Sequence, residues 1–360
     1  MKIKLNILFI LPNDSIGGAE KILKMVADYY SYNSNIKIFF LSKKKSKAWD
    51  DLICKKNVSV YYGQFNSIYL GLLNLFIFLF RNNKFDYSFS SQTLINGFLG
   101  LLIKLKIVCI KRFIGRESTT IFSRFKGLKL IKYKILIFLG YDKLDLLICQ
   151  TDLMSEQFHQ NLPNLSKKIK IKTIPNPFPE LKKLDFNNVP DYPYIVSAGR
   201  LIPEKGFDLL INAFHILQKE FDDLKLVILG EGQLRDTLQK QIIELNLTTK
   251  VILYGSVNNV YSFFKQAKLC VVSSNVEGFP NVLLEMMSQN TTVVSTKCAG
   301  GIDQLKGVSL VEVNDLNSLV NTLKTILKLD TSHNRKLFDR ELKSRSINKF
   351  INNIELSLDE

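Results

Sequence analysis

The chain has 360 residues, of which 46% are apolar and 23% are charged. This length is too great for one ordinary core, and the apolar fraction suffices to fill two cores of about 150 residues each. Such a composition excludes an intrinsically disordered protein, because disorder requires low hydrophobicity.

The net charge of +16 is confined to the first half of the chain. Residues 1–180 hold 28 Lys and Arg against 12 Asp and Glu, whereas residues 181–360 hold 21 of each. This asymmetry indicates that the first half faces an anionic partner such as nucleic acid, acidic lipid headgroups or a phosphorylated lipid. An equally weighted alternative is that lysines only solubilise an apolar domain, since the basic residues are scattered and form one run of three, 43–45.

Cysteine usage and the N-terminus indicate a cytoplasmic protein. The five cysteines lie far apart without a C-x-x-C pair or a zinc-like spacing, and four of them stand in apolar runs where we expect buried thiols. Residues 1–11 are basic and then apolar, as in a secretory signal. The apolar run is short and no small-x-small cleavage site follows it, so a buried first strand is the better interpretation.

The longest apolar run, residues 68–80, contains thirteen residues with only Asn74 polar. A membrane-spanning helix needs about 20 residues, so this run is too short. We expect a buried helix here, with a helix lying in the membrane interface as the alternative. Lysines interrupt the other apolar stretches, at Lys104, Lys106 and Lys134, and no transmembrane segment is predicted.

Short β-rich runs alternate with helical patterns along the whole chain. This order is typical of an α/β protein with parallel sheets covered by helices on both faces. The predicted strands are 5–11, 36–41, 58–62, 87–90, 107–110, 146–149 and 169–174 in the first half, and 194–198, 225–229, 251–254, 269–273, 292–295 and 309–311 in the second. Helices of the second half are predicted near 206–220, 233–246, 259–267, 281–289 and 315–328.

Five prolines between residues 175 and 193 mark the boundary between the halves. The sequence therefore predicts a first Rossmann-like domain over 1–178, a linker over 179–193 and a second Rossmann-like domain over 194–335. The charged, helix-prone stretch 336–360 is predicted to be a closing C-terminal helix.

The strongest local signal follows the predicted strand 269–273, where Glu277 and Gly278 lead into Phe279, Pro280 and Asn281. Proline is favoured at the first turn of a helix, whose free N–H groups attract a phosphate. Asn281 and Glu285 are four residues apart and share one helical face. Taken alone, Glu285 is more simply an exposed helix residue and Glu277 a solvated loop residue.

A second cluster follows the predicted strand 194–198, where Gly199, Arg200, Lys205 and Gly206 stand in one loop. A guanidinium and an ammonium five residues apart can together neutralise a diphosphate. Their charges would matter most as negative charge grows on a departing phosphate. The alternative is an ordinary solvated pair, against which the bounding glycines argue.

Two further glycine loops connect a strand to a helix. Gly230 and Gly232 follow the strand 225–229, but Arg235 stands where a dinucleotide-binding fingerprint needs its third glycine. Gly17 and Gly18 follow the first strand and allow a ligand to approach the backbone closely.

With these clusters the chain resembles the retaining glycosyltransferases of family 4, including those of bacterial surface polysaccharides. That family has the GT-B fold, in which two Rossmann-like domains face each other across a cleft. The resemblance is strong over residues 190–302 and weaker before 175. Glu277 and Glu285, with seven residues between them, look like the family's paired glutamates.

The resemblance implies a role for each matching residue. Glu277 would contact the donor sugar, Glu285 the ribose, and Arg200 with Lys205 the diphosphate. The remaining donor-side residues would be Gly278, Phe279, Pro280, Asn281, Gly17, Gly18, Gly230 and Val257, the last beside the nucleotide base. Arg116 and Glu117 resemble a polar motif on the acceptor side, with a surface loop as the alternative interpretation.

The sequence departs from the family at one point. Many relatives place a histidine after a strand of the first domain, where this chain has Ser and Gln at 88–93. His159, His215 and His333 stand elsewhere. No Asp-x-Asp pair occurs, so no metal is implied, and we expect no cofactor besides the nucleotide sugar.

The predicted activity is retaining transfer of a hexose or N-acetylhexosamine from a nucleoside diphosphate sugar, with UDP the first choice. The acceptor would be a glycan or a lipid-linked oligosaccharide in lipopolysaccharide or capsule synthesis, and the enzyme would be cytoplasmic, peripheral on the inner face of the plasma membrane. Alternatives are a nucleotide-sugar epimerase or a non-catalytic nucleotide-sugar-binding partner of the same fold. Nucleic acid is not predicted as a partner, because no aromatic-basic motif of that class is present.

Overall fold

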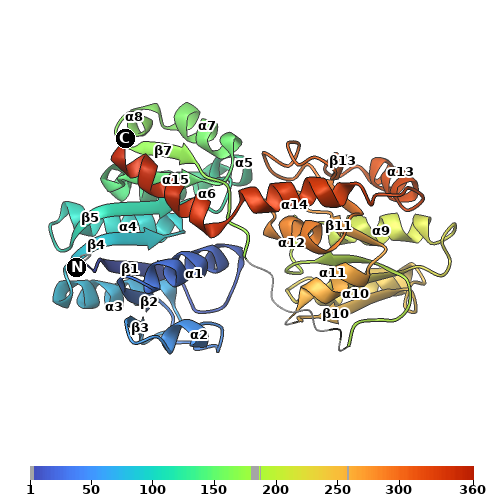
Figure 1. Cartoon of the computed structure of the whole chain (residues 1–360), viewed down its shortest axis with the longest axis horizontal. Coiled ribbons are helices and arrows are strands. Elements are labelled where there is room, and N and C mark those ends of the chain that lie inside the picture. Colours follow the sequence, from blue (N-terminus) through green and yellow to red (C-terminus); the bar gives the residue numbers. More distant parts are fainter. Residues whose placement is uncertain (1–3, 180–185, 187, 258) are drawn as a thin grey trace. The chain divides into compact units, whose positions relative to one another are not determined.

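A computed structural model describes residues 4–179, 186, 188–257 and 259–360. The chain divides into two compact units, unit 1 (Met1–Pro179 with Arg345–Glu360) and unit 2 (Glu180–Ser344). Each unit is a parallel sheet covered by helices on both faces (Figure 1). The α/β prediction is confirmed for both halves of the chain.

Unit 1 contains a seven-stranded parallel sheet in the order β3-β2-β1-β4-β5-β6-β7. The strands Asn6–Leu11 and Leu146–Cys149 are almost entirely hydrophobic because helices cover both faces of the sheet, whereas Lys84–Ser90 and Cys109–Arg116 also carry polar residues. The strands are β1 (Asn6–Leu11), β2 (Asn35–Phe40), β3 (Val58–Tyr62), β4 (Lys84–Ser90), β5 (Cys109–Arg116), β6 (Leu146–Cys149) and β7 (Lys170–Thr173).

Two hydrophobic clusters lie on the two faces of this sheet. One joins the sheet to α1 (Gly18–Ser31), α2 (Asp50–Ile53) and α15 (Ile347–Asp359). The other joins it to α3 (Ile68–Arg81), α4 (Thr93–Lys104), α6 (Gly127–Gly140) and α7 (Asp152–Asn161). The short helices α5 (Ile121–Arg124), η1 (Tyr141–Lys143) and α8 (Pro163–Ser166) complete the unit.

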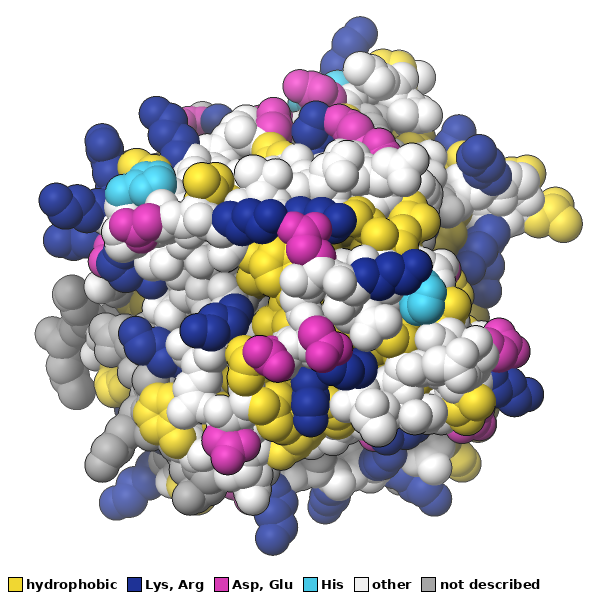
Figure 2. Space-filling view, turned by 90° about the vertical axis from the view of Figure 1, so that its right-hand side faces the viewer, with side chains coloured by type: hydrophobic (Ala, Val, Ile, Leu, Met, Phe, Trp, Pro, Cys, Tyr) yellow, Lys and Arg dark blue, Asp and Glu magenta, His cyan; other side chains and the backbone are white. Residues whose placement is uncertain are grey.

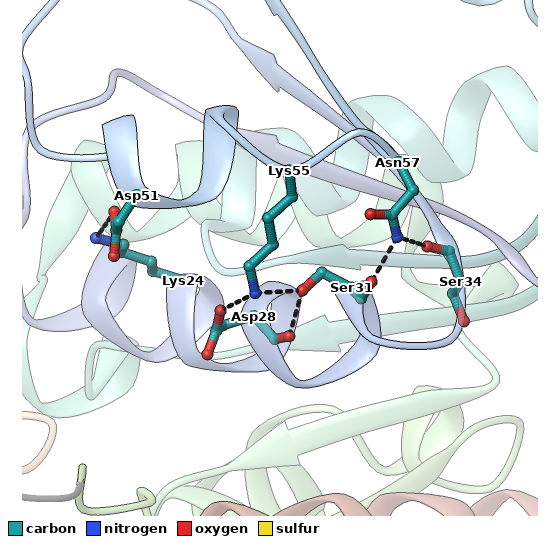
Figure 3. A network of polar contacts seen from close by, with 7 residues as sticks. All are labelled: Lys24, Asp28, Ser31, Ser34, Asp51, Lys55 and Asn57. Atoms are coloured by element: carbon teal, nitrogen blue, oxygen red, sulfur yellow. Dashed lines mark hydrogen bonds and ion pairs between the residues drawn. The ribbon is translucent and has the colours of Figure 1, made fainter.

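Some lysines of unit 1 form ion pairs with carboxylates of the same unit (Figure 3). Lys24 of α1 pairs with Asp51 of α2 at 2.6 Å, and Lys55 donates to Asp28 of α1 at 2.6 Å and to Ser31 at 2.8 Å. These contacts fasten α2 and the following loop to α1. These two lysines therefore each have a carboxylate partner within the unit.

Unit 2 contains a six-stranded sheet in the order β10-β9-β8-β11-β12-β13, again parallel throughout. The strands are β8 (Tyr194–Ala198), β9 (Lys225–Leu229), β10 (Val251–Gly255), β11 (Leu269–Val272), β12 (Val293–Thr296) and β13 (Ser309–Val311). The helices are η2 (Pro203–Lys205), α9 (Phe207–Leu217), α10 (Arg235–Glu244), α11 (Val260–Gln266), α12 (Asn281–Gln289), α13 (Leu316–Ile326) and α14 (Asn334–Ser344).

Charges of both signs are interspersed on the face of the molecule drawn in Figure 2. Lys and Arg side chains are spread over this face between acidic, neutral and hydrophobic ones. A field of one sign therefore does not cover it.

The two strand orders decide where each unit can bind a ligand. In both sheets the order in which the chain adds strands reverses next to the first strand, between β1 and β4 in unit 1 and between β8 and β11 in unit 2. In open α/β sheets, ligands bind at the carboxyl ends of the strands beside this reversal. The loops with Gly17 and Gly18, with Gly199 and Gly206, and with Gly278 follow the strands at these points, whereas the loop with Gly230 and Gly232 follows the neighbouring strand β9.

Two expectations about the chain are wrong, and a third lies partly outside the described residues. The expected single helix over 336–360 is wrong, because Ser346 caps a new helix, α15, by accepting from the Lys349 N–H, and α14 and α15 belong to different units. The structure buries three cysteines instead of the expected four, leaving Cys54 and Cys109 exposed. In the predicted linker, residues 180–185 and 187 lie outside the described residues.

The expectation of a buried helix over 68–80 is also wrong in part. Helix α3 forms there, but it buries only the face that carries Gly71, Leu72, Leu75 and Leu79. Ile68 and Phe78 pack partly buried against the core, and the other six apolar side chains are exposed: Tyr69, Leu70, Leu73, Phe76, Ile77 and Phe80.

Candidate donor site

The candidate site of unit 2 lies where the loops after β8 and β11 meet. The Asn275 N–H donates to the Glu204 carbonyl at 2.8 Å, and the Ser273 hydroxyl donates to the Lys205 carbonyl at 2.9 Å. Gly206 permits this approach, since its φ is +59° and a side-chain methyl there would stand 2.3 Å from the Ser273 carbonyl oxygen. The tertiary contact therefore joins two clusters that are far apart in the sequence, with 72 positions separating Lys205 from Glu277.

Lys205 and Glu277 form an ion pair at this junction. The Lys205 ammonium donates to Glu277 Oε1, and the two side chains are only 16% and 18% exposed. Ser274 donates to the same carboxylate oxygen at 2.9 Å, and the Glu277 N–H donates to the Cys298 carbonyl at 2.8 Å. The alternative of a solvated loop residue is therefore wrong for Glu277, because its carboxylate is held between an ammonium and a hydroxyl.

The other cation of the predicted pair, Arg200, stands at the start of the same loop, directly after Gly199, with its side chain exposed. The Lys205 side chain runs along Gly199, where an added methyl would stand 3.2 Å from the lysine Cε. The loop therefore presents one exposed and one partly buried positive charge at the carboxyl end of β8.

Helix α12 begins beside Glu277. Pro280 is its N-cap and makes no side-chain capping hydrogen bond. Asn281 is the first helical residue and Glu285 stands one turn later, both partly buried. Phe279 is buried and anchors the turn that contains Gly278. Amide groups of such a turn are suited to bind an anion.

The loops after β9 and β10 lie next to the β8 loop. Gly230 has a φ of +137°, and a methyl there would stand 1.9 Å from the Gly199 carbonyl oxygen. The Gly230 N–H donates to the Gly255 carbonyl at 2.8 Å. Val257, two residues after Gly255, is partly buried. These glycines bring three loops together at one edge of the sheet.

In unit 1 the predicted glycine loop begins α1 at the carboxyl end of β1. Gly17 is the N-cap of α1 without a side-chain capping bond, and Gly18 is the first helical residue; both are exposed. The Glu20 carboxylate turns back toward them, because a methyl on Gly17 would stand 2.6 Å from its Oε2. An acidic group thus stands beside the helix start in this structure.

Arg116 and Glu117, at the end of β5, are 3% and 1% exposed. The alternative of a surface loop is therefore wrong for this pair. Arg116 donates to Ser91 at 3.0 Å and to Asn176, and its Nε has no hydrogen-bond partner among the described residues. A cavity of about 10 Å³ adjoins Arg116, which is room for one water molecule and not for a sugar.

Burial shifts the pKa of both side chains. Removal from water raises the pKa of Glu117 to about 7, although hydrogen bonds from Tyr141 and Thr93 and the charge of Arg116 act against the shift. Burial lowers the pKa of Arg116 to about 10, which the nearby carboxylates of Glu20 and Glu117 oppose. The Glu20 carboxylate thus favours the charged form of Arg116. This interaction connects the first turn of α1 with the end of β5.

Sequence reasoning missed three polar residues of these sites. Ser274 stands three positions before Glu277 in the same loop, a spacing that could have suggested the hydrogen bond. Glu20 lies in the first turn after the glycines, and Tyr141, which donates to Glu117, carries no local signal. Among the described residues, no group of three His, Cys, Asp or Glu side chains could hold a metal ion.

Comparison with known proteins identifies the class of unit 2. Residues 180–341 match the sequence profile of the family described as Glycosyl transferases group 1. The match covers nearly all of unit 2 and just under half of the chain. The family resemblance and the expectation of a glycosyltransferase are confirmed by this match.

Two relatives of the chain come from Campylobacter jejuni. N-acetylgalactosamine-N,N'-diacetylbacillosaminyl-diphospho-undecaprenol 4-alpha-N-acetylgalactosaminyltransferase is 37% identical over 59% of this chain, and the match spans 58% of that relative, less than two thirds of its length. GalNAc-alpha-(1->4)-GalNAc-alpha-(1->3)-diNAcBac-PP-undecaprenol alpha-1,4-N-acetyl-D-galactosaminyltransferase is 26% identical over 84% of this chain and 82% of its own length.

Among solved structures, HepE from Anabaena in complex with UDP-glucose superposes with a TM-score of 0.78, covering 99% of both chains at 18% identity. This likeness confirms the fold of two Rossmann-like domains. In the part of the chain that the structure describes, every helix is too short or too polar to cross a membrane.

Proposed function

We propose that the glycosyltransferase transfers a sugar from a nucleoside diphosphate donor bound at the β8–β11 edge of unit 2. The observation that carries this proposal is the Lys205–Glu277 ion pair, held partly buried in the loop before α12. Arg200 at the start of the same loop supplies a second positive charge. One site thus combines cations for a diphosphate with a carboxylate for sugar hydroxyls.

Binding of the donor would change the partner of Lys205. Without a ligand, Glu277 neutralises the ammonium. A diphosphate competes for Lys205 and Arg200, which frees the Glu277 carboxylate to accept hydrogen bonds from the sugar. Glu285 would accept from the ribose hydroxyls, and Val257 would adjoin the base.

The same cations would stabilise the departing nucleotide. As the bond between the anomeric carbon and the phosphate oxygen breaks, negative charge grows on that oxygen, and fixed charges and amide dipoles stabilise it without reorganisation. The acceptor hydroxyl would attack the face that the nucleotide leaves and pass its proton to the departing phosphate oxygen as the new bond forms, so that the anomeric configuration is retained.

The comparisons support a choice of donor and acceptor. HepE was solved with UDP-glucose, which favours a UDP donor. The two Campylobacter relatives are named for acceptors on undecaprenol diphosphate and for transfer of N-acetylgalactosamine. We therefore propose transfer of a hexose or N-acetylhexosamine to a glycan or lipid-linked acceptor in bacterial surface polysaccharide synthesis. The reaction would take place in the cytoplasm, at the inner face of the plasma membrane.

A thermal-shift screen of nucleotide sugars tests the donor, because a ligand that binds only the folded state raises the Tm. We expect UDP-sugars to raise the Tm and Glu285→Ala to weaken this shift. With an acceptor present, release of UDP and a product of unchanged anomeric configuration by NMR would support transfer with retention. Conversion of the donor sugar without an acceptor would identify an epimerase instead, and binding without any turnover would identify a non-catalytic partner.

A further inference from the structure

Unit 1 exposes an unusual amount of apolar surface on two helices. Of the 21 large hydrophobic side chains exposed among the described residues, ten lie on α3 and α6. We call this set the apolar face of α3 and α6; it consists of Tyr69, Leu70, Leu73, Phe76, Ile77, Phe80, Leu128, Ile131, Ile135 and Phe138. Contiguous exposed apolar surface of this kind marks a site of interaction.

The exposed side chains form one stripe along each helix. With about 100° per residue, the four on α6 fall within a sector of about 80°, and the six on α3 within about 120°. Leu128 and Phe138 are the most exposed, at 86% and 84%. Lys132 of α6 donates to the Tyr69 hydroxyl of α3 at 2.9 Å, so a side-chain hydrogen bond links the two stripes at this point.

Helix α6 is apolar on two opposite sides. Its inner side packs against α4 so closely that a methyl on Gly100 would stand 2.0 Å from the Gly140 carbonyl oxygen. Ile137 is buried on that side. Burial against the core therefore accounts for the inner apolar residues but leaves the outer stripe without a structural purpose.

Lysines border the outer stripe of α6 on both sides. By the same helical geometry, Lys132 and Lys129 follow one border and Lys134 the other. No Asp or Glu occurs within residues 68–81 or 127–140. Lysine side chains lie along apolar surface while their ammonium groups reach for anions.

We infer that the apolar face of α3 and α6 inserts into the interface of an anionic lipid bilayer. Apolar side chains would enter the boundary between headgroups and acyl chains, while the bordering lysines contact lipid phosphates. A second copy of the chain fits less well, because self-association through this face would bring lysines against lysines without a carboxylate from either helix. The inference specifies the surface for the proposed membrane location, and it can fail without affecting the donor site.

Sedimentation of the full-length protein with vesicles tests the inference. We expect binding to vesicles rich in phosphatidylglycerol at low salt and weak binding to phosphatidylcholine alone. Each lysine near an anionic surface changes binding about fivefold, so replacing Lys129, Lys132 and Lys134 by Gln should weaken it about a hundredfold. The double variant Leu128→Glu with Phe138→Glu removes two apolar anchors, so its affinity for the vesicles should fall by more than about a hundredfold.

Leu356→Glu is the matched control, because Leu356 is an apolar residue 63% exposed on α15 of the same unit. It should bind vesicles like the unchanged protein. Tm and the UDP-induced thermal shift verify that each variant is folded and that its donor site is intact. The inference is overturned if the unchanged protein ignores anionic vesicles, if the α6 variants bind as well as the control, or if size-exclusion chromatography shows a dimer that the double variant converts to a monomer.

Discussion

Exchange of partners at Lys205 predicts opposite effects from removing the two members of the ion pair. Lys205→Ala removes a cation that binds the diphosphate. A hydrogen bond to a charged group contributes about 2 kcal/mol, so UDP should bind about thirtyfold more weakly. Glu277→Gln removes the carboxylate that competes with UDP for the same ammonium.

The size of this second effect follows from the burial of the pair. Both side chains are about one-sixth exposed, so the pair is stronger than a surface ion pair, for which up to about 1 kcal/mol is typical. If the pair contributes about 1 to 2 kcal/mol, freeing Lys205 by Glu277→Gln should tighten UDP binding about five- to thirtyfold. The affinity that a UDP-sugar gains over UDP should fall, and so should the turnover rate, because the carboxylate that contacts the sugar is gone.

Isothermal titration with UDP and with a UDP-sugar measures both quantities for the single and double variants. Lys297 and Glu312 form a matched control, since they are an exposed ion pair in the same unit. Substitutions there should leave UDP affinity unchanged. If Glu277→Gln weakened UDP binding as much as Lys205→Ala, the exchange of partners would be refuted and the pair would be purely structural.

Three further predictions concern stability and the donor. Gly230→Ala should cost at least about 2 kcal/mol and lower the Tm of unit 2 by about 5 °C, because its methyl would overlap the Gly199 carbonyl and its φ is +137°. Glu117→Gln should flatten the pH dependence of unit 1 stability. Glu117 has a pKa of about 7 against an ordinary 4.5. The stability that its protonated form contributes is therefore fully present below about pH 4.5 and is lost as the pH rises through about 7, a change of about 3 kcal/mol in the free energy of unfolding. Glu285→Ala should weaken UDP binding about tenfold but leave binding of uracil alone unchanged, because only the ribose contact is lost.

Each of these predictions has a control. Gly127→Ala shares the positive φ but has open space around its added methyl, so it should cost less than Gly230→Ala; equal costs would contradict the steric argument. Hydrogen exchange of unit 1 amides at several pH values measures the stability of Glu117→Gln and of the unchanged chain. If the two stability profiles ran parallel with pH, Glu117 would not titrate in this range and the prediction would be wrong. For Glu285, an equal loss of uracil and UDP binding would indicate collapse of the site.

The periodicity of the sequence predicted most of the elements, because most strands are rich in hydrophobic residues and the loops between them carry glycine and proline. The helix at 281–289 agrees with α12 at both ends. Local pattern failed for the strand expected at 107–110, since β5 continues to Arg116. The polar residues at its end are buried by a tertiary network that includes Tyr141 and Asn176, and no local spacing indicates such a network.

The order of residues alone determined that two α/β units exist and that glycine-bounded cations and spaced glutamates follow strands of the second. Those features depend on hydrophobic period, backbone conformation and charge, which are local properties of the chain. Only the tertiary structure decided that Lys205 meets Glu277, that Arg116 is buried and that the outer sides of α3 and α6 stay uncovered. Each of these depends on which distant segments pack together, and a helix with two apolar sides does not reveal in its sequence which side will be buried.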